Sequence, residues 1–453
     1  MLMRSLFKQG LCSLIVSMNL SGGSPEPRPD GSEFLGGLPR LRMMPIFSVG
    51  HPSEKLSQRS FQPFSCLRQD YEERLQALPS LVEQARDSDV SDDESVTPIN
   101  SPVKDGGVGL DTTPQIYASF SGGGAKGLLQ ASAQRAICEE TGIKLRDLYD
   151  AVAGTSVGAI LGAASAFDVL SAEDCVNFFK EEVPGVFPAS RWNKFITMGG
   201  FAAPVYSREP LDLILQDKFG DKKLSDARIP YAAVSVLQYQ DPYGFWSNPV
   251  SHIFNSKIAI ENPLLHDTYM SHVLAATSAA PSYFRSPEWE YAGKKARALD
   301  GGLVANSPDN QVLLLAYEHY QKLGSDDIVL LYRTGGLDPK LEKKPGFITR
   351  SLNRISPFRR GGLYEHAGSV FHSFMDSGLA EDNARRLALS LGIKEENIFT
   401  LNADLSDTDM ARVDVPFLTE LEEKGGGIIK ALEHGQRERL LNAVRTRAEA
   451  RRE

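Results

Sequence analysis

Hydrophobic and polar positions become regular near Gln115. Residues 115–120 (QIYASF) alternate and are rich in β-forming side chains, and residues 128–140 then carry apolar side chains at helical spacing. The same reasoning predicts strands at 149–153, 231–237 and 328–332 and a helix at 157–167. Strands interleaved with helices favour an α/β domain built on a mainly parallel sheet.

The chain before that point has a different composition. Residues 21–63 hold seven prolines among glycines and serines, which breaks both helical and strand periodicity. Residues 87–114 begin with an acidic run and are interpreted as a linker, so we expect residues 1–114 to be mostly disordered. We expect a core at 115–325 and the remainder of the α/β domain at 326–424. A basic amphipathic C-terminal helix is expected at 425–453.

The composition bounds the class of protein. The 453 residues are 42% hydrophobic and 24% charged, which is typical of a globular protein with ample material for a core. The net charge of -9 gives no whole-chain attraction to phosphate backbones and argues against a dedicated nucleic-acid binder. The four cysteines are widely spaced, with no Cys-x-x-Cys pair and no Cys/His cluster of zinc spacing. These cysteines therefore indicate neither a disulfide framework nor a structural metal. As a separate expectation, the protein works without a cofactor.

Two stretches bear on location. Arg4 and Lys8 precede an apolar run near the amino terminus, as in a signal peptide, but no A-x-A-like cleavage site follows. Residues 151–167 carry no charge, yet they are too few and too rich in glycine and alanine for a membrane-spanning helix, so we expect an interior helix there. A cytoplasmic or peripheral-membrane protein is expected, with secretion as the alternative.

A glycine loop lies between the first predicted strand and the first predicted helix. Residues 122–127 (GGGAKG) satisfy G-x-G-x-x-G, the dinucleotide-binding fingerprint, in the context that this motif requires. A nucleotide site also needs an acidic residue at the end of the next strand, and this strand ends differently. The loop is not a Walker A loop either, because Leu128 follows the last glycine.

The next predicted strand leads into residues 154–158 (GTSVG), which match G-x-S-x-G. In this motif a nucleophilic serine, here Ser156, sits on a sharp turn between strand and helix, and Gly154 and Gly158 allow the crowded backbone. The helix that begins at Val157 directs its positive end at the hydroxyl. A five-residue match also arises by chance, but its place between a strand and a helix favours the nucleophile.

A serine nucleophile gives the glycine loop a different use. Acyl transfer produces a tetrahedral oxyanion, and consecutive glycines let backbone N–H groups converge on it without obstruction by Cβ atoms. Gly123 and Gly124 are the expected donors. The alternative, a purely structural turn, would need fewer glycines.

The serine also needs a base. The histidines are scattered, and none lies in a context typical of catalysis. Asp300, Gly301 and Gly302 follow a strand-like segment and by themselves indicate a turn. A carboxylate within hydrogen-bond reach of Ser156 can accept its proton, and near neutral pH this requires burial to raise the pKa of Asp300.

Together the segments GGGAKG, GTSVG and DGG resemble, in order and in sheet context, those of the patatin-like phospholipases. Residues 276–284 (ATSAAPSYF) also resemble the segment that this family carries ahead of its aspartate, so the resemblance covers about residues 115–320. It implies a three-layer α/β/α sandwich with a mainly parallel central sheet. It also implies hydrolysis of fatty-acyl esters of phospholipids or lysophospholipids without a metal.

The same resemblance implies roles for individual residues. Ser156 is the nucleophile and Asp300 its base, in a Ser/Asp dyad that forms an acyl-enzyme. The oxyanion hole falls on Gly122, Gly123 and Gly124. The residues that complete the three motifs are Lys126, Gly127, Gly154, Gly158, Gly301 and Gly302.

Two segments outside the motifs are candidates for peripheral contact with a membrane. Residues 198–205 (MGGFAAPV) either touch lipid beside the cleft or form an ordinary packed connection. The C-terminal helix has apolar residues at helical spacing and six arginines. It either lies on anionic membranes or docks on the catalytic domain, since interspersed glutamates dilute its charge.

Three functions remain open at this level. The motifs favour a lipid acyl hydrolase. A catalytically silent lipid-binding or scaffold protein would keep the fold without reactivity at Ser156. A dinucleotide-binding enzyme would gain thermal stability from its cofactor through the glycine loop.

Overall fold

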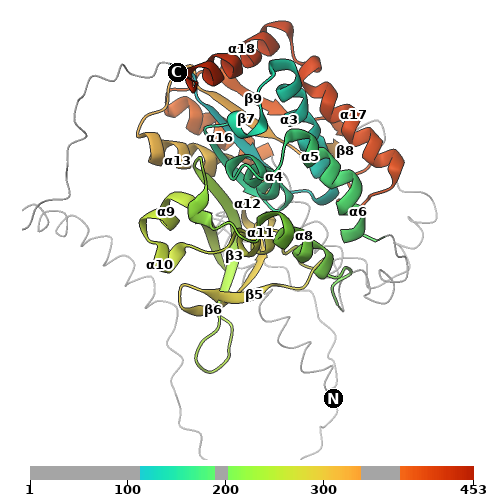
Figure 1. Ribbon diagram of the computed structural model, residues 1–453, viewed down its shortest axis with the longest axis vertical. Helices are drawn as coiled ribbons and strands as arrows, with labels where there is room; N and C mark the ends of the chain where they lie inside the picture. Colours follow the sequence, from blue (N-terminus) through green and yellow to red (C-terminus); the bar gives the residue numbers. More distant parts are fainter. Residues whose placement is uncertain (1–112, 189–202, 338–377, 453) are drawn as a thin grey trace, which may run out of the picture. The chain divides into compact units, whose positions relative to one another are not determined.

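The computed structural model describes residues 113–188, 203–337 and 378–452, all within one structural unit, Val103–Glu453 (Figure 1). The expectation for residues 1–114 therefore lies almost wholly outside the described residues. Within them, a central sheet is sandwiched between helices, which is the expected α/β class.

An eight-stranded sheet forms the centre of the unit. Its strands run in the order β5 (Glu288–Tyr291), β6 (Lys294–Asp300), β3 (Tyr231–Tyr239), β2 (Ala151–Thr155), β1 (Ile116–Phe120), β7 (Ile328–Tyr332) and β9 (Ile398–Leu401), while β4 (Val250–Asn255) also pairs with β3. The strands from β3 to β9 in this order are parallel, which confirms the expected mainly parallel sheet. β4 and β6 run antiparallel to β3, and β5 runs antiparallel to β6. A separate small sheet pairs β8 (Gly336–Leu337) with β10 (Asp404–Leu405).

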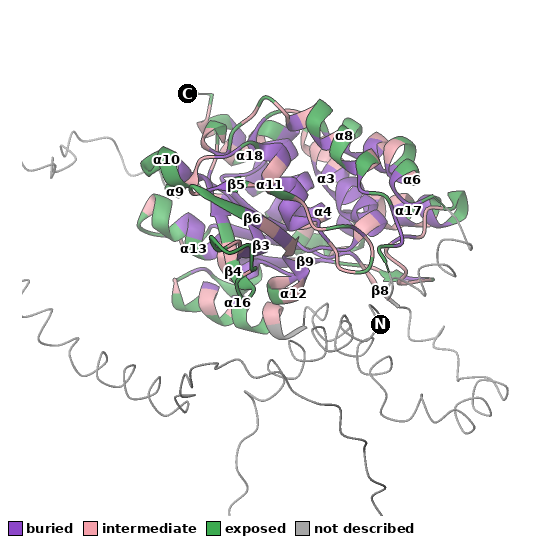
Figure 2. Ribbon diagram, turned by 90° about the horizontal axis from the view of Figure 1, so that it is seen from below, coloured by how far each residue is buried: buried purple, intermediate pink, exposed green. Residues whose placement is uncertain are grey.

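Helices cover both faces of the sheet. Successive residues of a strand point to opposite faces, so the apolar side chains of each strand contribute to a core on either side. Ile116 and Ala118 of β1 share one hydrophobic core with side chains of α3 (Gly127–Thr141), α4 (Val157–Ala166), α17 (Val415–Ala431) and α18 (His434–Ala450). Tyr117 belongs instead to the core beneath α13 (Asp309–Tyr320) and α16 (Gly378–Ser390). Figure 2 shows the buried sheet with the exposed helix surfaces around it.

The described residues also form several shorter helices. They are α5 (Ala172–Asn177), α6 (Val183–Val186), α8 (Glu209–Phe219), α9 (Ser256–Glu261), α10 (Pro263–His266), α11 (Met270–Thr277) and α12 (Gly302–Ala305). α8, α11 and α12 lie near one another around β3 in Figure 1.

β3 brings two distant segments together along one edge. β4 occupies one edge of β3, so β2 and β6 share the other. β2 pairs in parallel with β3 until Thr155 stands opposite Val234. β6 pairs antiparallel until Asp300 stands opposite Ser235, the next residue of β3. β2 and β6 therefore run toward each other and end side by side, which brings Ser156 next to Asp300.

The C-terminal region differs from the expectation of one helix over 425–453. α17 ends and α18 begins across Leu432 and Glu433, whose backbone is extended. The three glycines at 425–427, where the expected helix begins, lie inside α17. A Cβ on Gly425 would come within 2.4 Å of the carbonyl oxygen of Leu129 on α3, so this glycine lets the two helices pack closely.

Of the two alternatives for this region, the structure shows docking. Leu440, Leu441 and Val444 of α18 are buried in the core. Arg447 and the neighbouring Arg451 form ion pairs of 2.8 and 2.7 Å with the buried carboxylate of Asp150, which precedes β2. None of the helices in the three described ranges is both long and apolar enough to cross a bilayer.

Candidate active site

Ser156 occupies the sharp turn that its motif predicts. It lies between β2 and α4, and its backbone has φ 54° and ψ -125°, a strained combination for a residue with a Cβ. A Cβ on Gly154 would come within 2.3 Å of the backbone of Ala159. A Cβ on Gly158 would come equally close to the carbonyl oxygen of Phe120, 2.3 Å away. Neither position can hold a side chain without moving the backbone, so the turn depends on both glycines.

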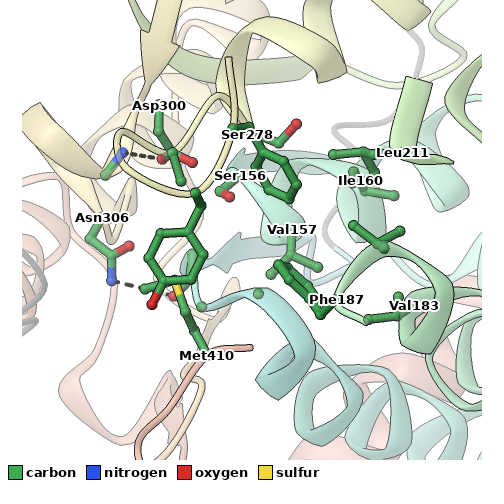
Figure 3. Close-up of a pocket in the computed structure, with 18 of the residues that line it drawn as sticks. Ser156, Val157, Ile160, Val183, Phe187, Leu211, Ser278, Asp300, Asn306 and Met410 are labelled. Carbon is green, nitrogen blue, oxygen red and sulfur yellow. Dashed lines mark hydrogen bonds between the residues drawn. The ribbon is translucent and has the colours of Figure 1, made fainter. Parts of the chain in front are cut away.

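Asp300, the last residue of β6, reaches the serine from the opposing strand (Figure 3). The hydroxyl of Ser156 lies near the Asp300 carboxylate and acts to lower its pKa. The N–H of Gly302 donates to Oδ1 of Asp300 at 2.7 Å. A Cβ on Gly301 would lie 2.1 Å from the carbonyl oxygen of Val234, so the chain can turn here only with a glycine. The fold therefore brings these two motif residues, which lie far apart in the sequence, to one end of the same pocket.

Burial raises the pKa of Asp300 to about 6. Desolvation outweighs the N–H of Gly302, the serine hydroxyl and the positive charge of Arg208, each of which lowers this pKa. Arg208 is itself buried, and it donates to Oδ1 of Asp212 at 2.8 Å. A carboxylate with this pKa is ionised at neutral pH and still has enough proton affinity to accept a proton from a hydroxyl.

Thr277 links the turn that carries Ser156 to the sheet. It ends α11 and is fully buried. Its Oγ1 accepts from the N–H of Ser156 at 2.9 Å and donates to the carbonyl oxygen of Val234. Its carbonyl oxygen accepts from the N–H of Gly301 at 3.2 Å. One buried residue thus holds both turns, and only its place in the segment 276–284 drew attention to it in the sequence.

The glycine loop lies against the same turn. The N–H of Gly122 donates to the carbonyl oxygen of Asn306 at 3.0 Å, so the expected role of Gly122 as an oxyanion donor is not supported. A Cβ on Gly122 would lie 2.6 Å from Oδ1 of Asn306, which explains the glycine by close approach instead. Within the described part of the chain, the N–H groups of Gly123 and Gly124 have no hydrogen-bond acceptor. They stay the predicted donors.

A segment near the C-terminal end supports the loop from its other side. The carbonyl oxygen of Met410 accepts from the N–H of Ala125 at 2.8 Å. Gly124 has φ 59°, and a Cβ there would come within 2.4 Å of the same oxygen. The side chain of Met410 also lines the pocket beside Ser156. Residues beyond the expected core of 115–325 therefore complete the site, and no sequence pattern marks them.

The last two residues of the glycine loop do not line the pocket beside Ser156. Lys126 is 7% exposed, and burial lowers its pKa to about 8, although the charges of Asp407 and Asp409 oppose that effect. A Cβ on Gly127 would come within 2.5 Å of the ring of Phe179, so this glycine allows α3 to start close to its neighbour. Both positions shape the loop.

An apolar pocket opens beside the serine (Figure 3). α4, α6 and α8 contribute to its walls, and the polar groups gather where Ser156, Asp300 and the glycine loop meet. Its apolar lining includes Val157, Ile160, Val183, Phe187, Leu211 and Met410. An apolar pocket with a few convergent polar groups is typical of a binding site for a small apolar ligand. Across residues 113–188, 203–337 and 378–452, no group of three His, Cys, Asp or Glu side chains is placed to hold a metal ion.

The apolar segment 198–205 is only partly described. Residues 198–202 lie outside the described residues. Val205 at its end is buried, and its N–H donates to the carbonyl oxygen of Ser282 at 2.9 Å. Of the described residues of this segment, Ala203 and Pro204 are exposed and Val205 alone is packed.

Three relatives and one family bear on the identity of the domain. Residues 118–312 match the family described as patatin-like phospholipase. The chain is 27% identical to Patatin-like protein 2 of Oryza sativa subsp. indica, over 42% of this chain and 50% of that protein. It is 30% identical to the cGAMP-activated phospholipase of Escherichia coli (strain TW11681), over 46% of this chain and 56% of that protein. It is 28% identical to the 85/88 kDa calcium-independent phospholipase A2 of Mus musculus, over 45% of this chain and 24% of that protein.

The chain spans about half the length of the first two relatives and about a quarter of the third. The matched residues 118–312 contain both Ser156 and Asp300. They also include most of β1 and all of β2, β3 and β6, which carry or position these two residues. Residues 118–312 therefore form a patatin-like domain, by their match to the patatin-like phospholipase family.

Proposed function

We propose that this chain is a lipid acyl hydrolase of the phospholipase A or lysophospholipase type, with a Ser/Asp dyad. One observation carries the proposal: Ser156 stands on a strained turn beside an apolar pocket, and the buried carboxylate of Asp300 lines the same pocket near the serine hydroxyl. The family of residues 118–312 and the phospholipases among the relatives support the same class of reaction.

In this mechanism Asp300 takes the hydroxyl proton as Oγ of Ser156 forms a bond to the ester carbonyl carbon. The N–H groups of Gly123 and Gly124 stabilise the resulting oxyanion. When the intermediate collapses, the bond from the carbonyl carbon to the alcohol oxygen breaks, and the leaving alcohol takes the proton from Asp300. Water then attacks the acyl-enzyme with the same base and releases the fatty acid.

The pocket supports a fatty-acyl substrate over a nucleotide. Of the described residues that line it, Asp300 alone carries a formal charge. An anionic dinucleotide would meet a carboxylate and no cation there, whereas an acyl chain meets aliphatic and aromatic walls. We therefore place the acyl chain in the pocket and the ester carbonyl at Ser156.

A fluorophosphonate probe tests the nucleophile, because it reacts covalently with activated serines. We expect labelling of the wild type and none of Ser156→Ala. The matched control is Ser278→Ala, which removes another serine of the same pocket whose hydroxyl donates to the carbonyl oxygen of Leu274, and which should still be labelled. Mass spectrometry should show fatty acid released from phosphatidylcholine or its lyso form by the wild type. A wild type that neither reacts nor hydrolyses is a silent scaffold.

The rate is expected to depend on pH through Asp300. The base works only when ionised, and its pKa is about 6, so kcat/KM should be constant above about pH 7 and fall about tenfold per unit below pH 6. Hydrolysis of a soluble short-chain ester between pH 4.5 and 8 measures this profile. A profile without an inflection between pH 5 and 7 would contradict the assignment of Asp300.

A further inference from the structure

The turn between β3 and β4 exposes two large aromatic side chains. Tyr243 is 87% exposed and Phe245 is 72% exposed. Val250, where the chain enters β4, is also exposed. A single exposed apolar side chain is ordinary, but neighbouring apolar side chains on one projection form a patch that indicates an interaction surface. We call residues 240–250 the aromatic turn.

Hydrogen bonds inside the aromatic turn pair the backbone N–H groups next to its two exposed rings. The N–H of Asp241 donates to the carbonyl oxygen of Phe245 at 2.8 Å. Oδ1 of Asp241 accepts from the N–H groups of Tyr243 and Phe245 at 2.9 and 2.8 Å. Gly244, at φ 88°, closes the turn and donates to the carbonyl oxygen of Asp241 at 3.0 Å. The rings can therefore enter an apolar medium without leaving these peptide groups unpaired, which is what a lipid environment requires.

Basic side chains of β6 lie against two other aromatic rings of this region, those of Trp246 and Tyr239. The guanidinium of Arg297 lies 4.4 Å from the ring centre of Trp246, and Nζ of Lys295 lies 5.6 Å from it. Nζ of Lys294 lies 5.9 Å from the ring centre of Tyr239. Tryptophan and tyrosine favour the level of the lipid headgroups, and lysine and arginine near that level meet the phosphates. The turn therefore carries apolar rings at Tyr243 and Phe245, and next to them side chains that suit the level of the lipid headgroups.

The aromatic turn projects on the side of the sheet that carries the site. β2 ends with Thr155 opposite Val234, and Ser156 follows at that edge. β3 continues from Val234 to Tyr239, five residues or about 17 Å further in the same direction. In Figure 1 the chain after β3 extends beyond β5 and β6. A membrane in contact with the aromatic turn would therefore lie on the same side of the sheet as Ser156.

We propose that the aromatic turn docks this protein on phospholipid bilayers, with Tyr243 and Phe245 inserted among the lipids and the pocket held toward their surface. The inference rests on the proposed function, which takes its ester from a bilayer. Glu288 lies 2.8 Å from Lys295 and offsets its charge. Insertion of the rings, more than attraction between charges, therefore carries the binding.

Co-sedimentation of the full chain with phosphatidylcholine vesicles tests the aromatic turn. The double variant Tyr243→Ser/Phe245→Ser should partition to the vesicles about tenfold or more weakly than the wild type. The matched control is Leu389→Ser, which removes another exposed apolar side chain, on α16, and should bind as the wild type does. All three proteins should hydrolyse a soluble short-chain ester at the same rate, because the aromatic turn does not line the pocket.

Each alternative outcome has a definite meaning. Equal vesicle binding by the double variant and the wild type overturns the proposal, and so does an equal loss in Leu389→Ser. A parallel loss of soluble-ester hydrolysis also overturns it, because the turn would then act through the fold of the site. A change in oligomeric state with unchanged vesicle binding makes the turn a protein interface instead. A wild type without any esterase activity contradicts the proposed function, while the vesicle comparison still decides the role of the turn.

Discussion

Replacement of Asp300 by Asn is expected to lower kcat about a thousandfold with little change in KM. Asparagine has the same size and keeps an oxygen for the N–H of Gly302, which lies 2.7 Å from Oδ1 in the wild type. Its amide cannot accept the proton of Ser156, so the nucleophile loses its base. Steady-state kinetics on a soluble ester measure the effect, and Asp382→Asn, at an exposed position of α16, should retain the wild-type rate. A rate near that of the wild type in Asp300→Asn would rule out the base.

The same substitution is not expected to destabilise the protein at pH 8. The pKa of Asp300 is raised from 3.8 to about 6 by burial, so its contribution to stability is fully present below about pH 4 and is lost as the pH rises through 6. Two pKa units correspond to at most about 3 kcal/mol, and the uncharged amide escapes this loss. Denaturant unfolding at pH 8 should therefore give Asp300→Asn an unfolding free energy at least equal to that of the wild type. A clearly lower value would mean that the ionised carboxylate stabilises the fold.

Burial on both faces is why the parallel strands could be predicted from the sequence. Each of these strands is a short apolar run that can be recognised without knowing which strands pair with it. β7 is Ile328–Tyr332, as predicted, and β3 is Tyr231–Tyr239, two residues longer than the predicted 231–237. The C-terminal helix was predicted to begin at residue 425, but α18 begins at His434 and residues 425–431 belong to α17. Gly425 is instead a contact point with α3, and such a tertiary contact leaves no local pattern.

The members of the site could be predicted singly, but their arrangement could not. Motifs pointed to Ser156 and Asp300, whereas their proximity depends on β2 and β6 sharing one edge of β3. Gly122 was expected to donate to the oxyanion because glycine loops do so, yet its N–H is used by Asn306, 184 residues away. Met410 enters the pocket from outside the matched domain and carries no pattern of its own.

Thr277→Val is the substitution that separates positioning of the nucleophile from support of the fold. Valine fills the same space but removes the hydroxyl, so the N–H of Ser156 and the carbonyl oxygen of Val234 lose a buried partner. We expect the unfolding free energy to fall by about 2 kcal/mol. Because the strained turn at Ser156 is then held less firmly, kcat should also fall, on the order of tenfold to a hundredfold, with KM nearly unchanged.

Thr277→Ser provides the matched control, because it keeps the hydroxyl and loses only a methyl group. It should restore most of the kcat that Thr277→Val loses, even though the missing methyl costs about 1 kcal/mol of stability. Kinetics and denaturant unfolding of both variants, well below their melting temperatures, compare the two effects directly. If Thr277→Val were less stable but kept the wild-type kcat, the hydroxyl would support the fold alone, and the geometry of Ser156 would not depend on it.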